Sequence, residues 1–121
     1  AMGNNGNGRL GDGTTTDRHQ PIRIIESNVR AIAMGHAHSL FLKTDGSLWG
    51  MGHNWFGQLG NGTTTNKTTP MKLIDSNVIK LSSFKENSGT FSVTSSQLGT
   101  ISILLKHEKN LTHLNILYIF I

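Results

Sequence analysis

The chain has 121 residues, enough for one ordinary domain, and its formal net charge is +4. The absence of cysteine excludes disulfides, thiolate metal sites and a cysteine nucleophile, while 14 glycines and only 2 prolines favour short strands with tight turns. The basic residues are spread along the chain, which indicates a solvated surface and leaves nucleic acid or chromatin a weakly supported alternative partner.

The first segment has no sign of a leader. Residues 1–13 contain neither a basic region nor an apolar run, so they predict no signal peptide, and no stretch predicts a membrane partner. They also begin in the middle of a pattern that recurs later. We therefore expect the true N-terminus to be missing, and the sequence does not indicate a compartment.

Short strands are predicted from residue 29 onward. Residues 29–33 alternate apolar and polar side chains, residues 39–43 are apolar enough for a buried strand, and residues 48–51 return. Asp45-Gly46 between the last two predicts a hairpin turn whose two central residues both need positive φ. Residues 52–62 form a loop, residues 63–69 are polar and exposed, and Pro70 leads into a strand at 71–74.

The last third departs from this pattern. Residues 91–93 are a candidate degenerate counterpart of residues 40–42, and residues 98–105 are a candidate returning strand. A degenerate blade, a tail from a shifted reading frame and a truly divergent segment remain open as interpretations of residues 85–121. Residues 111–121 are strongly apolar and predict either a cover for an open sheet edge or an aggregation-prone tail.

The chain repeats itself. Residues 1–35 and 50–84 align without a gap at an offset of 49 residues, and 15 of the 35 pairs are identical. A period of this length is typical of propeller blades, each of which buries its apolar face against its neighbours.

The repeat resembles that of the regulator-of-chromosome-condensation family. The matching residues are Gly35, His38, Asp45, Gly46, Trp49, Gly52, Asn54, Gly57, Gln58, Leu59, Gly60, Gly62 and Pro70. The resemblance implies an all-β fold, here an incomplete β-propeller of about two blades of antiparallel strands with a divergent C-terminal segment. We assign residues 1–84 to propeller repeats (partial repeat 1–28, full repeat 29–78, start of the next 79–84) and residues 85–121 to a divergent or degenerate tail.

Three motifs suggest chemistry that their context does not support. Gly6 to Gly11 match a dinucleotide-binding pattern, but a poor helix start follows. The histidines at 36, 38 and 53 lack a carboxylate at ligand spacing, and the resemblance makes His38 a buried structural residue. Ser39 and His38 are strand neighbours that face opposite ways, so with Asp45 they make no triad. We predict no catalytic, cofactor-binding or metal-binding residue.

Trp55 and Phe56 are candidates for binding a protein partner, together with His53. The first copy has Gly6 and Asn7 at the two aromatic positions, so the fold does not require aromatic side chains there. Exposed aromatics on a rigid loop are good anchors for a partner. The competing interpretation is that they pack against a neighbouring blade.

The predicted function is that of a non-enzymatic protein-interaction module, with a protein partner of unknown identity. Two alternatives remain: a fragment of a guanine-nucleotide exchange factor for a small GTPase, and purely structural repeats of a larger protein.

Overall fold

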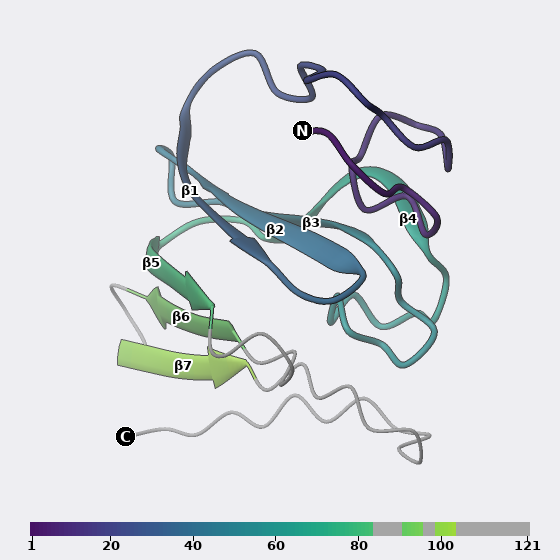
Figure 1. Ribbon diagram of the computed structural model, residues 1–121. Coiled ribbons are helices and arrows are strands. Elements are labelled where there is room, and N and C mark those ends of the chain that lie inside the picture. Colours follow the sequence, from purple (N-terminus) through teal and green to yellow (C-terminus); the bar gives the residue numbers. More distant parts are fainter. Residues whose placement is uncertain (84–90, 96–98, 104–121) are drawn as a thin grey trace.

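The structure is a computed structural model that describes residues 1–83, 91–95 and 99–103. These residues form strands and loops without a helix, and so contain no apolar helix that would cross a membrane. The strands are β1 (Val29–Met34), β2 (His38–Lys43), β3 (Leu48–Gly52), β4 (Lys67–Ile74), β5 (Val78–Ser83), β6 (Phe91–Ser95) and β7 (Gly99–Ile103). They build two antiparallel sheets, in the orders β1-β2-β3-β4 and β5-β6-β7 (Figure 1).

The hairpin between β2 and β3 lies where it was predicted but has a different turn. Leu42 pairs with Leu48, and Lys43 closes the turn by donating its N–H to the Ser47 carbonyl at 3.0 Å. Only Gly46 has a positive φ, of 83°, so the prediction that Asp45 shares it is wrong. The Asp45 carboxylate accepts the Ser47 N–H at 2.9 Å, which holds the turn with Asp45 in an ordinary conformation.

Strand β4 begins earlier than its sequence predicts. It starts at Lys67 rather than after Pro70, so the polar stretch 63–69 is only partly a loop. Lys67 pairs with Gly52 and Met71 pairs with Gly50, which leaves two extra residues on the β4 side. This irregularity accommodates Pro70, because proline has no N–H to give to a regular ladder.

The hydrophobic core lies between the four-stranded sheet and β5. Its buried side chains are Ala33, Leu40, Leu42, Leu48, Leu59, Val78 and Leu81, with Ala31, Leu73 and Ile74 packed against them. The two sheets are therefore held together by one continuous apolar layer, as stacked repeats require.

The N-terminal segment packs along the four-stranded sheet. It lies beside β4 and then passes across to the start of β1 (Figure 1). Gly13 donates its N–H to the Thr68 carbonyl at 2.8 Å, and Ser39 donates its hydroxyl to the Arg9 carbonyl at 2.8 Å. The partial first repeat thus supplies a structural element of the blade that follows it.

The turn at residues 44–46 joins the starts of two strands. Thr44 donates its N–H to the carbonyl of Asn28, just before β1, and Gly46 accepts the N–H of Val78, which opens β5. Asn28 and its counterpart Asn77 both have positive φ, 67° and 70°. Asparagine tolerates this left-handed conformation better than other non-glycine residues.

Strands β6 and β7 lie where the degenerate repeat was predicted. β6 pairs with β5 and β7 pairs with β6, as β2 pairs with β1 and β3 with β2. The apolar segment 111–121 and the rest of the predicted tail lie outside the described residues.

Candidate functional site

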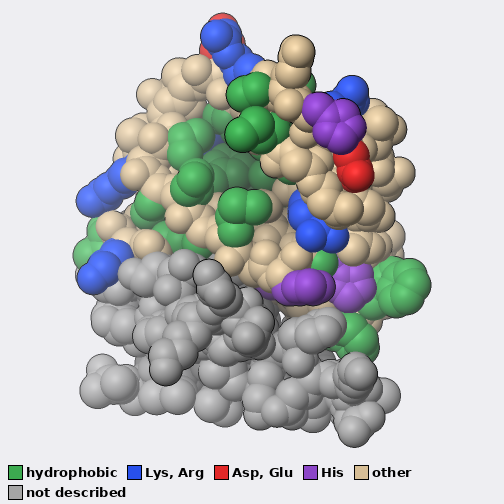
Figure 2. Space-filling model, viewed as in Figure 1, with side chains coloured by type: hydrophobic (Ala, Val, Ile, Leu, Met, Phe, Trp, Pro, Cys, Tyr) green, Lys and Arg blue, Asp and Glu red, His purple; other side chains and the backbone are tan. Residues whose placement is uncertain are grey.

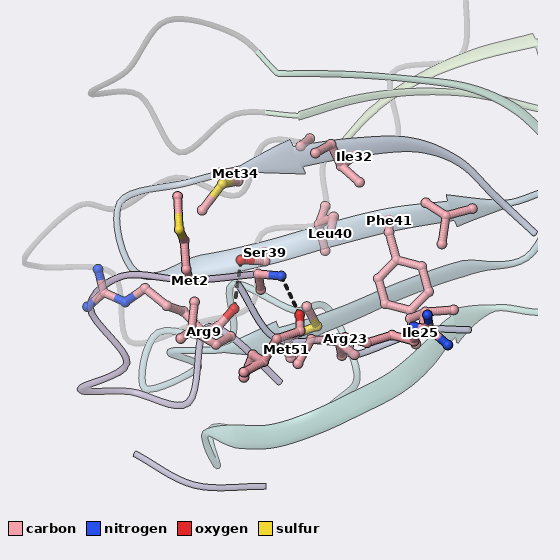
Figure 3. Close-up of a pocket in the computed structure, with 16 residues that line it drawn as sticks. Met2, Arg9, Arg23, Ile25, Ile32, Met34, Ser39, Leu40, Phe41 and Met51 are labelled. Carbon is pink, nitrogen blue, oxygen red and sulfur yellow. Dashed lines mark hydrogen bonds between the residues drawn. The ribbon is translucent and has the colours of Figure 1, made fainter. Parts of the chain in front are cut away.

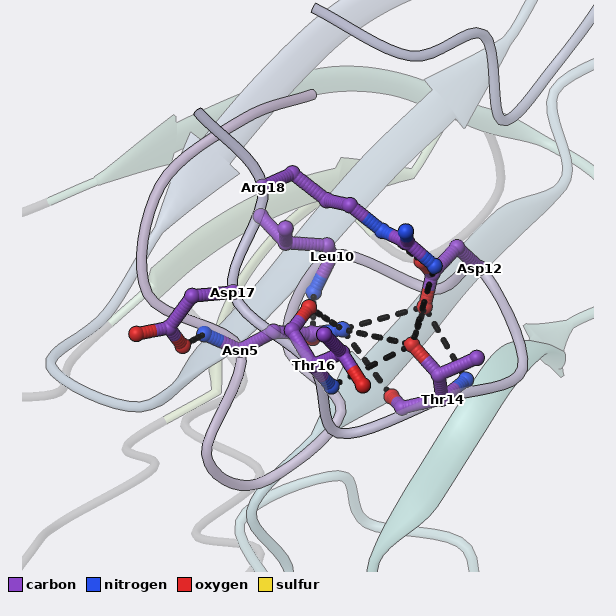
Figure 4. Close-up of polar contacts among 7 residues, drawn as sticks. All are labelled: Asn5, Leu10, Asp12, Thr14, Thr16, Asp17 and Arg18. Carbon is purple, nitrogen blue, oxygen red and sulfur yellow. Dashed lines mark hydrogen bonds and ion pairs between the residues drawn. The ribbon is translucent and has the colours of Figure 1, made fainter. Parts of the chain in front are cut away.

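Two loops at equivalent places in the repeat are built around a buried asparagine. We call residues 3–18 the first loop and residues 52–67 the second loop. In the first loop, Asn5 is fully buried and its Nδ2 donates to the carbonyls of Thr14 and Thr16 at 3.0 and 3.1 Å. Its Oδ1 accepts the N–H of Leu10 at 3.0 Å (Figure 4).

The second loop reproduces these bonds. Asn54 is also fully buried, and its Nδ2 donates to Thr63 and Thr65 carbonyls at 3.0 and 3.1 Å. Its Oδ1 accepts the N–H of Leu59 at 2.9 Å. One side-chain amide therefore holds each loop in shape from the inside, because it pairs with backbone groups that would otherwise be buried without a partner.

The loops differ in charge. Asp12 and Arg18 form an ion pair at 2.7 Å in the first loop. At these positions the second loop has Asn61, which is neutral, and Lys67, which therefore has no acidic partner at the position equivalent to Asp12. Hydrogen bonds from Thr14 to the Asp12 carboxylate, followed by the contact with Arg18, hold the pKa of Asp12 well below its usual range. The central asparagine of the first loop thus donates to the carboxylate of Asp12, and that of the second loop donates to the side-chain amide oxygen of Asn61.

The second loop carries the three partner-binding candidates. Trp55 is 67% exposed, while His53 and Phe56 are half-buried. The ring of His53 lies 5.6 Å from that of Trp55 and 5.7 Å from that of Phe56, the latter edge-on. The structure therefore brings all three together, with His53 in contact range of both aromatics.

Gln58 fixes the base of this aromatic group. Its Oε1 accepts the N–H of Phe56 at 2.9 Å, and its Nε2 lies 2.8 Å from Nδ1 of His53. Gln58 is itself buried, so both partners are held by a side chain that solvent does not reach. In the first loop the equivalent residue is Arg9, which instead donates to the His36 carbonyl at 2.8 Å.

Trp49 forms a separate group on the sheet. Its ring stacks on Phe41 with centroids 6.1 Å apart, and its Nε1 donates to Ser47 Oγ at 2.8 Å. The ammonium groups of Lys43 and Lys72 lie 5.0 and 5.4 Å from the ring centroid, in the range of a cation–π interaction. The neighbouring Ser47 engages Asp45, whose pKa is lowered first by the Ser47 hydroxyl and backbone and then by these lysines.

The residues of the motifs that suggested chemistry have structural roles in the turns and strands. In the glycine pattern, Gly8 and Gly11 are turn residues that follow Asn5. Ser39 donates its hydroxyl to a backbone carbonyl, and His38 packs against Gly35, where a Cβ would lie 2.8 Å from Nδ1 of the imidazole. No group of three potential metal ligands occurs among the described residues.

Sequence reasoning missed the role of the buried amides. Asn54 belongs to the repeat signature but is assigned no function there, and Asn5 occupies the same position in the first copy. The available signal was an asparagine at the same offset in both copies, followed by a glycine-rich loop with no strand or helix to satisfy its backbone.

The comparison with protein families decides the identity of the repeat. The model for the regulator of chromosome condensation (RCC1) repeat matches residues 1–42 and 45–86, and a second RCC1-repeat model matches residues 29–58. The chain belongs to the RCC1-repeat family. The predicted resemblance is confirmed. No curated protein sequence matches the chain.

A solved structure supports the propeller fold. The crystal structure of human WBSCR16 is similar, with a TM-score of 0.64 and 25% sequence identity. The match covers 84% of this chain and 27% of the human protein, so the chain spans about a quarter of that relative. The predicted all-β fold, a partial propeller built from RCC1 repeats, is confirmed.

Proposed function

We propose that this chain is a non-enzymatic protein-interaction module whose partner contacts the second loop through Trp55, flanked by His53 and Phe56. RCC1-repeat propellers generally mediate protein interactions and are generally non-catalytic. That general property agrees with two members of the suggested triad, since the Ser39 hydroxyl donates to a backbone carbonyl and the Asp45 carboxylate accepts the Ser47 hydroxyl.

The exposure of Trp55 on a fixed loop is the observation that carries this proposal. Trp55 is 67% exposed and its ring contacts that of His53, while the first loop has Gly6 at the equivalent position. The loop is nevertheless held firmly, by the amide of Asn54 from within and by Gln58 beneath the aromatics. A large aromatic side chain presented without loss of loop entropy is typical of a binding hot spot.

The test compares partner capture by three proteins: the wild type, Trp55→Ala and Ile79→Ala. Ile79 is a matched control because it is also an apolar residue, is 45% exposed and lies on β5, outside the second loop. Loss of a hot-spot tryptophan costs about 2 kcal/mol or more, so we expect roughly 30-fold weaker binding for Trp55→Ala and none of this loss for Ile79→Ala.

Folding of Trp55→Ala is checked by the fluorescence of Trp49, the tryptophan that remains. Because Trp55 is exposed, its removal is expected to leave the unfolding midpoint unchanged. Equal affinity of wild type and Trp55→Ala for every captured partner would refute the proposed contact.

A further inference from the structure

The imidazole of His53 lies between the buried side chain of Gln58 and the exposed ring of Trp55. Its Nδ1 is 2.8 Å from Nε2 of Gln58, and its ring centroid is 5.6 Å from that of Trp55. Gln58 is buried and His53 is half-buried, so this contact connects the interior of the second loop to the residue that carries the proposed partner contact. The protonation state of His53 therefore bears on how Trp55 is presented.

The hydrogen bonds of Gln58 determine which form of His53 fits. Its Oε1 accepts the N–H of Phe56 at 2.9 Å, so the other end of the amide, which faces His53, is the NH₂ group. Because an NH₂ group is only a donor, Nδ1 of His53 must be the acceptor. The bonded form is thus the neutral imidazole that carries its proton on Nε2.

Protonation of His53 removes this fit. An imidazolium carries a proton on both ring nitrogens, so its Nδ1–H would face the NH₂ group of Gln58, another donor. Turning the amide over does not restore the bonds, because the NH₂ group would then face the N–H of Phe56. Gln58 is buried, and donors that are buried without an acceptor are costly. A cation–π contact of the imidazolium with Trp55 is the smaller effect, because such contacts are weak at exposed sites.

The segments packed against His53 give it a basic neighbour. Its backbone N–H donates to the carbonyl of Ala37 at 2.9 Å, and a Cβ on the preceding Gly52 would lie 3.1 Å from Cα of Arg9. Arg9 donates to the carbonyl of His36, and its guanidinium is directed away from the pocket that the residue lines beside β1 and β2 (Figure 3). In the space-filling view, histidine and basic side chains adjoin hydrophobic ones along one edge of the described surface (Figure 2).

Neither residues 35–38 nor the second loop contains a carboxylate. Besides His53, their charged and titratable side chains are His36, His38 and Lys67. The first loop, which reaches Gly52 through Arg9, contains two carboxylates that are both engaged within that loop. Asp12 pairs with Arg18, and Asp17 accepts the N–H of Asn5 at 2.7 Å. Protonation of His53 thus adds a positive charge to a surface that already carries Arg9.

We propose that His53 makes partner binding at the second loop pH-dependent: the neutral imidazole holds Trp55 in its binding position, and protonation releases it. This inference rests on the proposed function and extends it to the regulation of the same site. An imidazole changes its charge between roughly pH 5 and pH 8. Because the bonded form is the neutral one, the site is held at the upper end of this range and is lost at the lower end.

Nuclear magnetic resonance of the isotope-labelled full chain tests the hydrogen bond without a partner. At about pH 8, Nδ1 of His53 should carry no proton. At about pH 5, the protection of the Phe56 N–H against hydrogen exchange, corrected for the intrinsic effect of pH, should be at least about fivefold lower. The N–H of Leu59, which is bound to Asn54, should keep its protection. A proton on Nδ1 at the higher pH, or equal protection of Phe56 at both, would overturn the proposal.

The variant Gln58→Glu should reverse the pH dependence. One glutamate oxygen can accept the N–H of Phe56 as Oε1 of Gln58 does, and the other can accept Nδ1–H of the protonated His53. We therefore expect Phe56 to be protected at about pH 5 and to lose protection toward pH 8. Gln20→Glu, at an exposed glutamine outside both loops, controls for the added charge and should behave as the wild type. The wild-type pH dependence in Gln58→Glu would contradict the assigned bond.

The variant His53→Gln provides a test that does not require Gln58→Glu to fold. It has no titratable group at this position, so the pH dependence of Phe56 protection should disappear. Persistence of the wild-type dependence in this variant would assign it to another group and would overturn the proposal.

Partner capture at the two pH values tests the functional consequence. The probe is the protein that the wild type retains, and that Trp55→Ala loses, at about pH 8. Its binding to the wild type should be at least about fivefold weaker at pH 5, and its binding to His53→Gln should not show this loss. Equal affinity of the wild type at both pH values would overturn the pH dependence and leave the contact through Trp55 intact. Failure to find any such protein would refute the proposed function and this inference with it, whatever the exchange measurements show.

Discussion

The first and second loops share a backbone and differ in the residues at their tips and in their charge. Gly8 and Gly57 have φ of 75° and 73°, and the bonds of the central asparagines agree to within 0.1 Å. Yet the first loop contains an ion pair, while the second loop has neutral residues in place of the acidic ones. The tip of the first loop has small residues, and the tip of the second loop has two aromatic residues.

This difference separates what the repeat requires from what it permits. Both loops have the buried amide because it pairs with the same three backbone groups in each, one N–H and two carbonyls. Asp12 and Asn61 are interchangeable because both offer an oxygen to the central asparagine, at 3.0 and 3.1 Å. The side-chain hydrogen bonds of the two asparagines go to residues other than those at the tips, so the second loop can carry Trp55 with the same backbone.

The largest difference between the two loops is expected when the equivalent glycines at positions 3 and 52 are each replaced by alanine. Gly3 and Gly52 have φ of 109° and 107°, so alanine is strained at both. At Gly52 the Cβ would also lie 2.6 Å from the Ala37 carbonyl and 2.8 Å from His38 Cα, whereas at Gly3 it meets nothing within 4 Å.

We therefore expect Gly3→Ala to cost about 1–2 kcal/mol and Gly52→Ala roughly 3 kcal/mol or more of unfolding free energy. Urea unfolding followed by tryptophan fluorescence measures both. Equal losses would show that backbone strain alone, rather than packing against residues 37 and 38, dictates glycine at this position.

A second comparison removes the central amides. Asn5→Ala and Asn54→Ala each leave buried backbone groups unpaired, and we expect each to cost roughly 2–4 kcal/mol, with similar values for the two loops. Asn4→Ala is the control, because Asn4 is exposed and accepts a single bond, from Gly6, so its loss should cost about 0.5 kcal/mol. The losses are measured by urea unfolding. A central asparagine that behaves like Asn4 would contradict the role assigned to it.

The smallest expected effect concerns pH and affects one loop only. The pKa of Asp12 is lower in the folded than in the unfolded chain, so its stabilisation is fully present above the ordinary carboxyl pKa of about 3.9. It is lost as the pH falls toward the folded pKa, when the carboxylate is protonated and the ion pair with Arg18 breaks.

Amide hydrogen exchange at Leu10 and Leu59 follows the two loops separately, because each N–H is bound to the asparagine of its own loop. Acidification should loosen Leu10 more than Leu59, and Asp12→Asn should remove that excess. The same excess in the Asp12→Asn variant would show that another group is responsible.

Much of the fold follows from pattern. The alternation in residues 29–33, the apolar run of β2 and the Asp45-Gly46 turn placed the first three strands correctly. A strand exposed on one face alternates with a period of two, whereas a strand buried on both faces, such as β2, is a continuous apolar run. The start of β4 was not predictable in this way. Lys67, Thr68 and Thr69 are polar and precede a proline, and Lys67 pairs with Gly52 of β3 across an irregular register that accommodates Pro70.

The candidate site was predicted only in part. A comparison of the two copies identified Trp55 and Phe56 as candidates, because the fold does not require a particular residue at a position that differs between the repeats. The contribution of Gln58, which contacts both His53 and Phe56, is a tertiary contact that no local pattern indicates. The charge difference between the loops was visible as Asp12 against Asn61, but its link to Arg18 depends on a loop conformation that spacing alone does not specify.

The three-residue turn at residues 44–46 has a consequence for how this architecture tolerates change. Two peptide groups of the turn form hydrogen bonds to the residues that begin two successive blades, at Asn28 and Val78. The length of the turn therefore sets the spacing between one blade and the next. An inserted residue there would leave each hairpin able to form but would misalign the stack. We therefore expect insertions to be tolerated at the loop tips, near Trp55, and not in the turn at residues 44–46.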